Sequence, residues 1–280
     1  VVESFQISKD AGYKIVAHMM PGLPTMTPEG DIMDFKKLFS DSDLRPDMLK
    51  IYPSLVIENT PLYEEYKRGE YNPYSDQDMI KVLTEVKKNI PKWVRIMRVQ
   101  REISPNEIIA GPKSGNLRQI VHQNLSKQGL SCKCIRCREV GLTSKKTDNQ
   151  DIKLNRINYE SSGGDEVFLS YEDTNDSIYG FLRLRKPSIN AHRKEVGNNS
   201  CIVRELHVYG KSLKLGEKGE NEIQHSGLGK NLMREAERIS KEEFDATRLL
   251  VISAVGTREY YQKIGYSLYG PYMVKTLNQD

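Results

Sequence analysis

The 280-residue sequence has no hydrophobic run long enough to cross a membrane. A spanning helix needs about 20 consecutive apolar residues, whereas charged residues make up 29% of this chain. The chain also does not open with the charged, apolar and small-residue pattern of a secretory signal. We therefore expect a soluble protein that works without a membrane partner.

Cysteine is scarce, with four residues in all, three of which lie within residues 132–137. This distribution is unsuited to a disulfide framework, which needs paired cysteines along the chain and an oxidising compartment. We expect a reducing, cytoplasmic location.

The sequence lacks an initiator methionine and begins inside a helix-like segment, residues 1–10. We therefore expect that it is missing an amino-terminal part. Its length still exceeds that of a common single domain, so two cores joined by a connector are expected.

The first hundred residues alternate between strands and helices. Strands are expected at residues 13–20, 48–53 and around Trp93, and helices at the ranges 27–39, 61–69 and 75–88, the last capped by Ser75. This alternation predicts parallel βα units, in an open sheet or in part of a (β/α) barrel. We expect Trp93 to be a core residue rather than a base-stacking one.

Positive charge is concentrated in the middle of the chain. Residues 81–160 contain 17 Lys and Arg against 7 Asp and Glu, whereas residues 1–80 contain 8 against 14. Clustered cations that release counterions are what nucleic-acid binding requires. A solvated basic surface is the alternative interpretation.

The cysteine loop predicts a metal site. Cys132, Cys134 and Cys137 lie within six residues, and three thiolates at this spacing suit tetrahedral zinc better than an iron–sulfur cluster. The fourth ligand is sought among His122, His192 and Cys201. We prefer His192, which lies in a polar loop, because Cys201 begins an apolar strand. A reduced structural cluster and a redox pair remain alternatives.

The carboxy-terminal part carries a pyrophosphate-binding pattern. Two half-buried strands are expected at residues 178–185 and 201–209, followed by the sequence QHSGLGK at 224–230, which opens a helix over 231–240. Glycines allow close approach of backbone amides, and the free N–H groups of a helix N-terminus bind anions. An ordinary tight turn is the alternative for such glycines.

From about Gly180 to the end, these segments resemble the GCN5-related (GNAT-type) acetyltransferase superfamily. A later strand at 248–254 and an aromatic-rich helix at 257–266 complete the likeness. Closer still, the sequences RELHVYG at 204–210, QHSGLG at 224–229 and GPYM at 270–273 resemble the catalytic subunit of Elongator in its archaeal or bacterial form. Residues 18–24, 47–53, 115–118 and 132–141 are similar to the same family, so the likeness spans nearly the whole chain.

The resemblance implies a fold of the α/β plus α+β class. It comprises a partial (β/α) barrel of the radical S-adenosylmethionine type at residues 1–110, a basic connector with a zinc-binding cysteine loop at 111–160, and a GNAT-like acetyl-CoA-binding domain at 161–280. It further implies carboxymethylation of the wobble uridine of tRNA. In that mechanism a deoxyadenosyl radical activates the acetyl methyl group for attack on uracil C5, and water then releases CoA. A homodimer is left open.

The resemblance also assigns the site residues. The expected acetyl-CoA contacts are Glu205, Leu206, His207, Val208, Gln224, Gly227, Leu228, Gly229, Lys230 and Tyr261. Tyr261 is the first choice for the tyrosine near the CoA sulfur and Tyr260 the second. From its place on the strand, and not from the resemblance, Glu205 is the candidate for positioning water.

One family feature is missing from this sequence. The [4Fe–4S] cluster that generates the radical from S-adenosylmethionine is held by Cys-x-x-x-Cys-x-x-Cys, and the chain contains no such motif. We therefore expect acetyl-CoA binding without radical generation. A protein lysine acetyltransferase and a non-catalytic RNA-binding module are the alternative functions.

Overall fold

The computed structural model describes residues 1–142, 151–197, 199–209 and 227–277. The chain packs as two compact units. The first contains Val1–Ile15, Ser42–Leu44 and Arg138–Asp280, and the second contains Val16–Asp41 and Arg45–Cys137. None of the helices among the described residues is both long and apolar enough to cross a membrane.

The second unit is built on a three-stranded parallel sheet. Its strands lie in the order β1 (Val16–Met19), β2 (Met48–Ile51) and β4 (Arg95–Arg98). Helix α2 (Pro28–Ser40) connects the first two strands and packs against α4 (Asp76–Lys88), which precedes β4. A capping box between Ser75 and Asp78 starts α4. The expected alternation of parallel strands and helices is confirmed.

The second unit contains further elements. They are β3 (Val56–Ile57), α3 (Pro61–Lys67), η1 (Pro105–Glu107), β5 (Ile108–Ala110), α5 (Leu117–Lys127) and α6 (Ile135–Arg138), whose last residue falls in the first unit. Strands β3 and β5 pair with each other, and α5 packs against α4. The sequence prediction missed α5, although Leu117, Val121 and Leu125 form a buried stripe at helical spacing.

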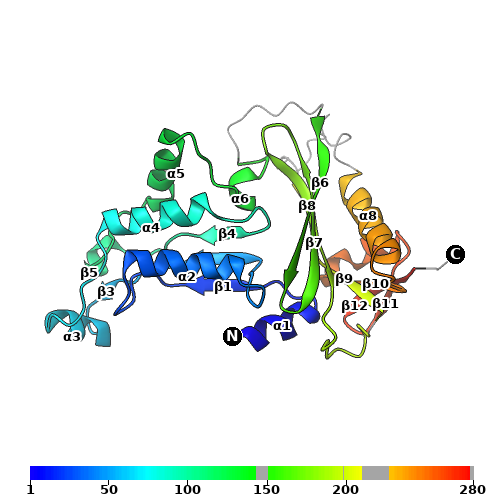
Figure 1. Cartoon of the computed structure of the whole chain (residues 1–280), viewed down its shortest axis with the longest axis horizontal. Coiled ribbons are helices and arrows are strands. Elements are labelled where there is room, and N and C mark those ends of the chain that lie inside the picture. The colour runs from blue at the N-terminus through cyan, green and yellow to red at the C-terminus, as the bar shows by residue number, and fades with distance from the viewer. Residues whose placement is uncertain (143–150, 198, 210–226, 278–280) are drawn as a thin grey trace. The chain divides into compact units, whose positions relative to one another are not determined.

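The first unit is built on a seven-stranded sheet (Figure 1). Its strand order is β11-β12-β10-β9-β8-β7-β6. All neighbours run antiparallel except β9 and β10. The strands are β6 (Lys153–Ser161), β7 (Gly164–Glu172), β8 (Ile178–Lys186), β9 (Ser200–Val208), β10 (Arg248–Ile252), β11 (Ser267–Tyr269) and β12 (Tyr272–Thr276).

Helix α8 (Leu228–Glu242) covers one face of this sheet, where it contacts β7, β8, β9 and β10 (Figure 1). Its buried residues Leu232, Met233, Ala236 and Ile239 recur at helical spacing and form the main core with the inward residues of the strands. The short helices η3 (Val255–Thr257) and α9 (Arg258–Gln262) follow β10, and Tyr261 of α9 belongs to the same core. These contacts hold α8 against β9 and its neighbouring strands.

The chain's first residues are bound to the seven-stranded sheet by buried charges. Helix α1 (Val2–Asp10) ends in Asp10, whose carboxylate lies 2.6 Å from Arg185 of β8. Arg185 also pairs with Glu166 at 2.9 Å, and Glu166 pairs with Arg204 of β9 at 2.9 Å. Removing one partner from such a buried pair typically costs about 3–5 kcal/mol. Residues 1–15 therefore fold as part of the first unit.

These packing units divide the chain differently from the three domains expected at 1–110, 111–160 and 161–280. Residues 1–15 and the segment from Arg138 onward lie with the seven-stranded sheet. Strand β6, expected within the connector, pairs along its whole length with β7 around a tight turn in which Ser162 and Gly163 have positive φ. The three-domain division stays a prediction about functional parts of the chain.

Candidate functional site

Strand β9 has an irregularity just before the residues expected to contact acetyl-CoA. Its register with β8 pairs Arg183 with Glu205 but Leu184 with Val203, so Arg204 is an extra residue and forms a bulge. The pairing of β9 with β10 runs from Ser200 to Val203. Residues 205–208 lie beyond this pairing and are paired with β8.

Helix α8 begins near the end of β9, where Gly229 lies beside Val208. Its N-cap is Gly227, which makes no side-chain capping hydrogen bond, and its first turn contains no acidic residue. The first-turn N–H groups and the positive end of the helix dipole therefore favour an anion here. Gln224, also expected in this site, lies outside the described residues.

Three predicted segments meet at Gly229. A Cβ on Gly229 would lie 3.2 Å from the hydroxyl of Tyr260 and 3.5 Å from Cγ2 of Val208. The end of β9, the first turn of α8 and helix α9 therefore surround one point, and any side chain at position 229 would intrude on it. This convergence brings together residues that are up to 52 positions apart in the sequence.

The two candidate tyrosines differ in their surroundings. Their rings stand edge to face with centroids 5.1 Å apart. Tyr261 is 6% exposed within the main core, where burial raises its pKa to about 12. The hydroxyl of Tyr260 is buried without a hydrogen-bond partner among the described residues, and burial raises the pKa of this group too. Tyr260 is therefore the tyrosine whose hydroxyl is available to a ligand at Gly229.

Glu205 is held by two cations. Its carboxylate lies 2.9 Å from Nε of Arg183 and 3.3 Å from Nζ of Lys14. Arg183 is buried between the rings of Phe168 and Phe181, with its guanidinium 5.3 and 5.4 Å from their centroids. This surrounding gives Glu205 a structural part in the sheet.

The neighbouring residues of β9 alternate between the two faces. Leu206 packs against the main core, while the ring of His207 stacks on Phe181 at 5.9 Å and approaches Tyr209 at 4.5 Å. Val208 is exposed at the end of the strand, next to Gly229. The side chains of this expected contact strand thus lie on the two faces of the sheet, and its main-chain groups lie along the strand edges.

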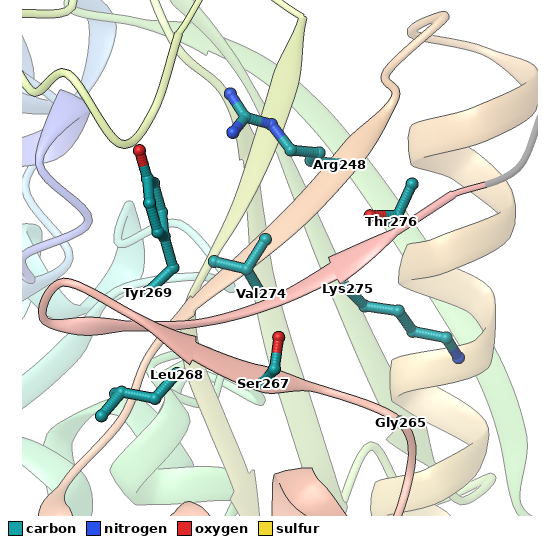
Figure 2. Close-up of a pocket in the computed structure, with 8 residues that line it drawn as sticks. All are labelled: Arg248, Gly265, Ser267, Leu268, Tyr269, Val274, Lys275 and Thr276. Carbon is teal, nitrogen blue, oxygen red and sulfur yellow. The ribbon is translucent and has the colours of Figure 1, made fainter.

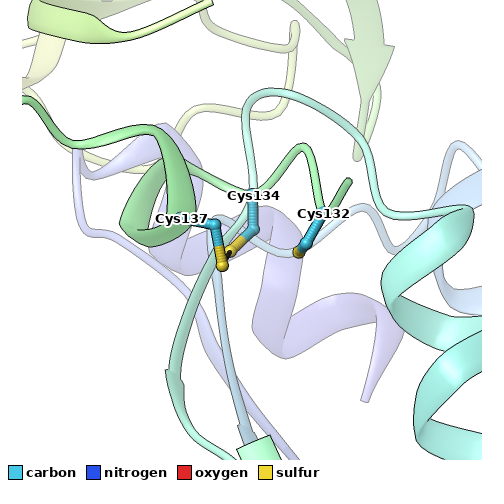
Figure 3. A group of neighbouring side chains, drawn as sticks. All are labelled: Cys132, Cys134 and Cys137. Carbon is cyan, nitrogen blue, oxygen red and sulfur yellow. Dashed lines mark hydrogen bonds between the residues drawn. The ribbon is translucent and has the colours of Figure 1, made fainter. Parts of the chain in front are cut away.

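The three cysteines of the loop converge in the second unit (Figure 3). Their sulfur atoms all lie within 4.8 Å of one another, and those of Cys134 and Cys137 are 3.4 Å apart. All three are free thiols, and Cys132 and Cys134 are buried. Hydrogen bonds from the other two thiols hold the pKa of Cys134 well below its usual value, which favours a thiolate.

His122 of α5 is the histidine beside these thiols. Its Nε2 lies 3.4 Å from Sγ of Cys137 and 2.8 Å from Nζ of the buried Lys87. Burial and the adjacent Lys87 ammonium lower the pKa of His122 to about 4, so its imidazole is neutral at pH 7 and able to bind a metal. The preferred candidate, His192, is exposed and belongs to the other unit.

The remaining fourth-ligand candidate is a core residue. Cys201 is completely buried on β9 among apolar side chains, and burial raises its pKa to about 11. This confirms the expectation that Cys201 packs in a core. The loop of three cysteines is the group of possible metal ligands found among the described residues.

Two further cavities are lined by described residues. One, of about 550 Å³, follows β4 in the second unit and is lined by the cations Arg98, Arg101, Lys113, Arg118 and Arg136. This cavity is where part of the chain's basic middle segment gathers. The other, of about 480 Å³, lies along β10, β11 and β12, and its lining includes no residue expected for the site (Figure 2).

Comparison with known proteins agrees with this architecture. The family description "Radical_SAM C-terminal domain" matches residues 46–127. The chain is 48% identical to the tRNA uridine(34) acetyltransferase of Methanocaldococcus jannaschii, over 99% of this chain and 52% of that protein. It is 46% identical to Elongator complex protein 3 of Homo sapiens, over 99% of this chain and 51% of that protein.

A solved structure extends the likeness to the fold. The archaeal Methanocaldococcus infernus Elp3 with an N-terminus deletion (1-46) superposes with a TM-score of 0.91 at 46% identity, covering 99% of this chain and 66% of that one. The chain belongs to the Elongator complex protein 3 family.

Membership of the Elongator complex protein 3 family confirms the resemblance and the fold class expected from the sequence. The parallel strand–helix part contains the segment matched as Radical_SAM C-terminal domain, and the seven-stranded sheet with α8 lies outside that segment. The chain spans about half the length of the relatives named above.

Proposed function

We propose that this chain contributes the acetyl-CoA-binding and tRNA-binding parts of an enzyme that carboxymethylates the wobble uridine of tRNA. The observation that carries the proposal is the convergence of β9, α8 and Tyr260 around Gly229, which offers backbone amides, a helix N-terminus and a phenol to one extended ligand. A relative at 48% identity bears the name tRNA uridine(34) acetyltransferase.

In this proposal the acetyl-CoA site is made mostly of backbone. Residues 205–208 hold the pantetheine and polarise the thioester carbonyl through main-chain groups. These groups lie on β9 beyond the residues that pair with β10. Gly227, Leu228, Gly229 and Lys230 bind the pyrophosphate at the start of α8, and Gln224 precedes them. Tyr260 directs its hydroxyl towards the part of the ligand beside Gly229, with Tyr261 packed behind it.

The tRNA is proposed to contact the cation-lined cavity after β4. Five Lys and Arg side chains surround it with one carboxylate, Glu102, in its lining. Such an excess of cations attracts phosphates and makes binding sensitive to salt. Acetyl-CoA hydrolysis that tRNA stimulates is the partial reaction that this chain's own residues would support.

The residues of this chain do not account for the radical half of the reaction. S-adenosylmethionine would supply the radical through a [4Fe–4S] cluster, but the sequence contains no Cys-x-x-x-Cys-x-x-Cys. Cys132, Cys134 and Cys137 have a different spacing. The proposed role of this chain is therefore confined to binding acetyl-CoA and tRNA and to releasing CoA.

The cysteine loop is proposed to hold a structural zinc ion, with His122 in place of His192 as the fourth ligand. Tetrahedral zinc bonds sulfur at about 2.3 Å, which places its ligand atoms roughly 3.5–4 Å apart. The separations of 3.4 Å between Cys134 and Cys137 sulfurs and of 3.4 Å from Cys137 to His122 suit such an ion. Zinc there would tie α5 to the loop that carries α6.

A hydrolysis assay tests the proposed function. The chain is incubated with labelled acetyl-CoA, with and without tRNA, and release of CoA is measured. We expect tRNA to stimulate release. Label transfer to a basic peptide without any need for tRNA would instead support the alternative, a protein lysine acetyltransferase.

A Glu205→Gln variant separates two roles of that residue. Its ion pairs with Arg183 and Lys14 support a structural part, so we expect reduced stability but tRNA-stimulated hydrolysis per folded molecule close to that of the wild type. A loss of hydrolysis in fully folded protein would restore Glu205 as the residue that positions water.

A further inference from the structure

A cavity of about 420 Å³ lies between α8, the turn after α9 and β12. Its lining is strongly basic, with the four cations Lys230, Arg234, Lys263 and Lys275 against the single carboxylate of Glu237. Of these charged residues, the sequence pattern predicted only Lys230 as part of an anion site. Because cations outnumber carboxylates in its lining, this cavity favours binding of an anion.

The one carboxylate is already occupied. Glu237 accepts hydrogen bonds from the hydroxyl of Tyr266 at 2.9 Å and from Nζ of Lys275 at 2.8 Å. Figure 2 shows Lys275 reaching from β12 towards helix α8, where Glu237 lies. Lys275 therefore balances Glu237, and the other three cations supply the net charge of the cavity.

The pattern of charges along α8 points the same way. Lys230 and Arg234 are four residues apart, a spacing at which like charges disfavour a helix by a few tenths of a kcal/mol. One turn later, Arg238 pairs with Glu235, Glu242 and Glu243 at 2.8–3.0 Å. The charge of Arg238 is thus neutralised by acidic neighbours, whereas Lys230 and Arg234 place two positive charges close together beside the cavity.

The position of the cavity identifies the anion. It starts at Lys230, immediately after the glycines proposed to bind the pyrophosphate, and Arg234 lies about one turn, roughly 5.4 Å, further along the helix. In CoA the 3′-phosphate is separated from the 5′-pyrophosphate by a single ribose. We infer that Arg234 and Lys263, with Lys230, bind the 3′-phosphate of acetyl-CoA. This inference rests on the proposed acetyl-CoA site.

The chemistry of the ligand explains why several cations are needed. A phosphate monoester carries nearly two negative charges at neutral pH, and charge-assisted hydrogen bonds from guanidinium and ammonium groups match it. Lys263 ends α9 next to Gly265, which has a φ of +93° and turns the chain into β11. The glycine turn and α8 thus bring cations from two elements to one phosphate.

The test compares acetyl-CoA with acetyl-3′-dephospho-CoA by titration calorimetry on the whole chain. We expect the wild type to bind the dephospho form about tenfold more weakly or worse. The double variant R234A/K263A should bind acetyl-CoA as weakly as the wild type binds the dephospho form, while its affinity for the dephospho form stays the same. Raising the salt concentration should reduce the discrimination in the wild type.

Arg238→Ala is the matched control, because it removes a cation from the same helix outside the cavity. It should preserve the discrimination, and thermal melts should show all variants folded. Equal wild-type affinities for the two ligands would overturn the inference and leave the proposed function standing. So would a double variant with unchanged discrimination. Failure of the wild type to bind either ligand would overturn both.

Discussion

The proposed acetyl-CoA site and the cysteine site are built from opposite materials. The first consists of main-chain groups and glycine, drawn from residues 205–208, the start of α8 and α9. The second consists of side chains, namely three thiols and one imidazole. The three sulfur atoms all lie within 4.8 Å of one another. A backbone site tolerates most side-chain changes but not a new Cβ at its closest approach. A thiol site, by contrast, should be disrupted by replacing any one of its ligating side chains.

This difference also separates binding from stability. The main-chain site lies on a sheet whose core is complete without a ligand, since α8 and the strands bury a continuous apolar cluster. The thiol site links α5 to the cysteine loop, in which the four-residue helix α6 is the regular element. Changes at the cysteines are therefore expected to act on folding, and changes at the glycine on ligand affinity.

The largest effect is expected from Cys134→Ser. Loss of a buried thiolate removes a zinc ligand, and the free energy of unfolding should fall by about 4 kcal/mol or more. Urea denaturation followed by circular dichroism, together with metal analysis, measures both quantities. Acetyl-CoA affinity of the folded fraction should change by less than about twofold, because the cysteines and the proposed acetyl-CoA site belong to different packing units and share no partner residues. Full stability in metal-free protein would contradict the structural zinc.

The next effect compares the two histidines. His122→Ala should lower zinc affinity by about a hundredfold or more, since even outer-shell partners of a metal contribute 10- to 100-fold. His192→Ala is the matched control and should leave zinc affinity unchanged, because His192 is exposed in the other unit. Competition with a chromophoric chelator measures both. The reverse ranking would return the fourth ligand to His192.

Local pattern predicted the start of α8 and the convergence of the three thiols, but not which histidine lies beside them. A glycine that opens a helix and three cysteines within six residues are local features, whereas residues 224–226 lie outside the described part of the chain. The fourth thiol-site partner is a matter of tertiary packing. His122 lies ten residues before Cys132, and only the folding of α5 against α4 brings it to Cys137. Its position on the helix between buried Val121 and Leu125 was the available signal.

The fold shows the same division between local and long-range information. Strand–helix alternation and the cap at Ser75 were evident from the sequence because periodicity and capping are local. The placement of residues 1–15 was not evident. It depends on Asp10 meeting Arg185, a contact across 175 positions that no local pattern announces.

A smaller effect is expected at the glycine where the three segments meet. Gly229→Ala adds a Cβ 3.2 Å from the hydroxyl of Tyr260, so acetyl-CoA affinity should fall by about tenfold, roughly 1.4 kcal/mol. Stability should hold or rise slightly, because Ala favours a helix over Gly. Gly256→Ala is the control, as a Cβ there meets no atom within 4 Å. Unchanged affinity in Gly229→Ala would remove the main-chain site from this position.

The smallest effect separates the two tyrosines and tests the main-chain site most finely. The Tyr260 hydroxyl is buried without a partner among the described residues, so Tyr260→Phe should cost no stability and lower tRNA-stimulated acetyl-CoA hydrolysis by about fivefold, the loss of one hydrogen bond. Tyr261→Phe should leave hydrolysis unchanged, because its ring serves the core. Steady-state hydrolysis and thermal melts of both variants give the answer. If Tyr261→Phe alone reduces hydrolysis, the site contacts a different face of α9, and the order of the tyrosines expected from the sequence stands. If Tyr260→Phe alone does, one phenol is the side-chain exception in the part of the site around Gly229, which is otherwise built from backbone.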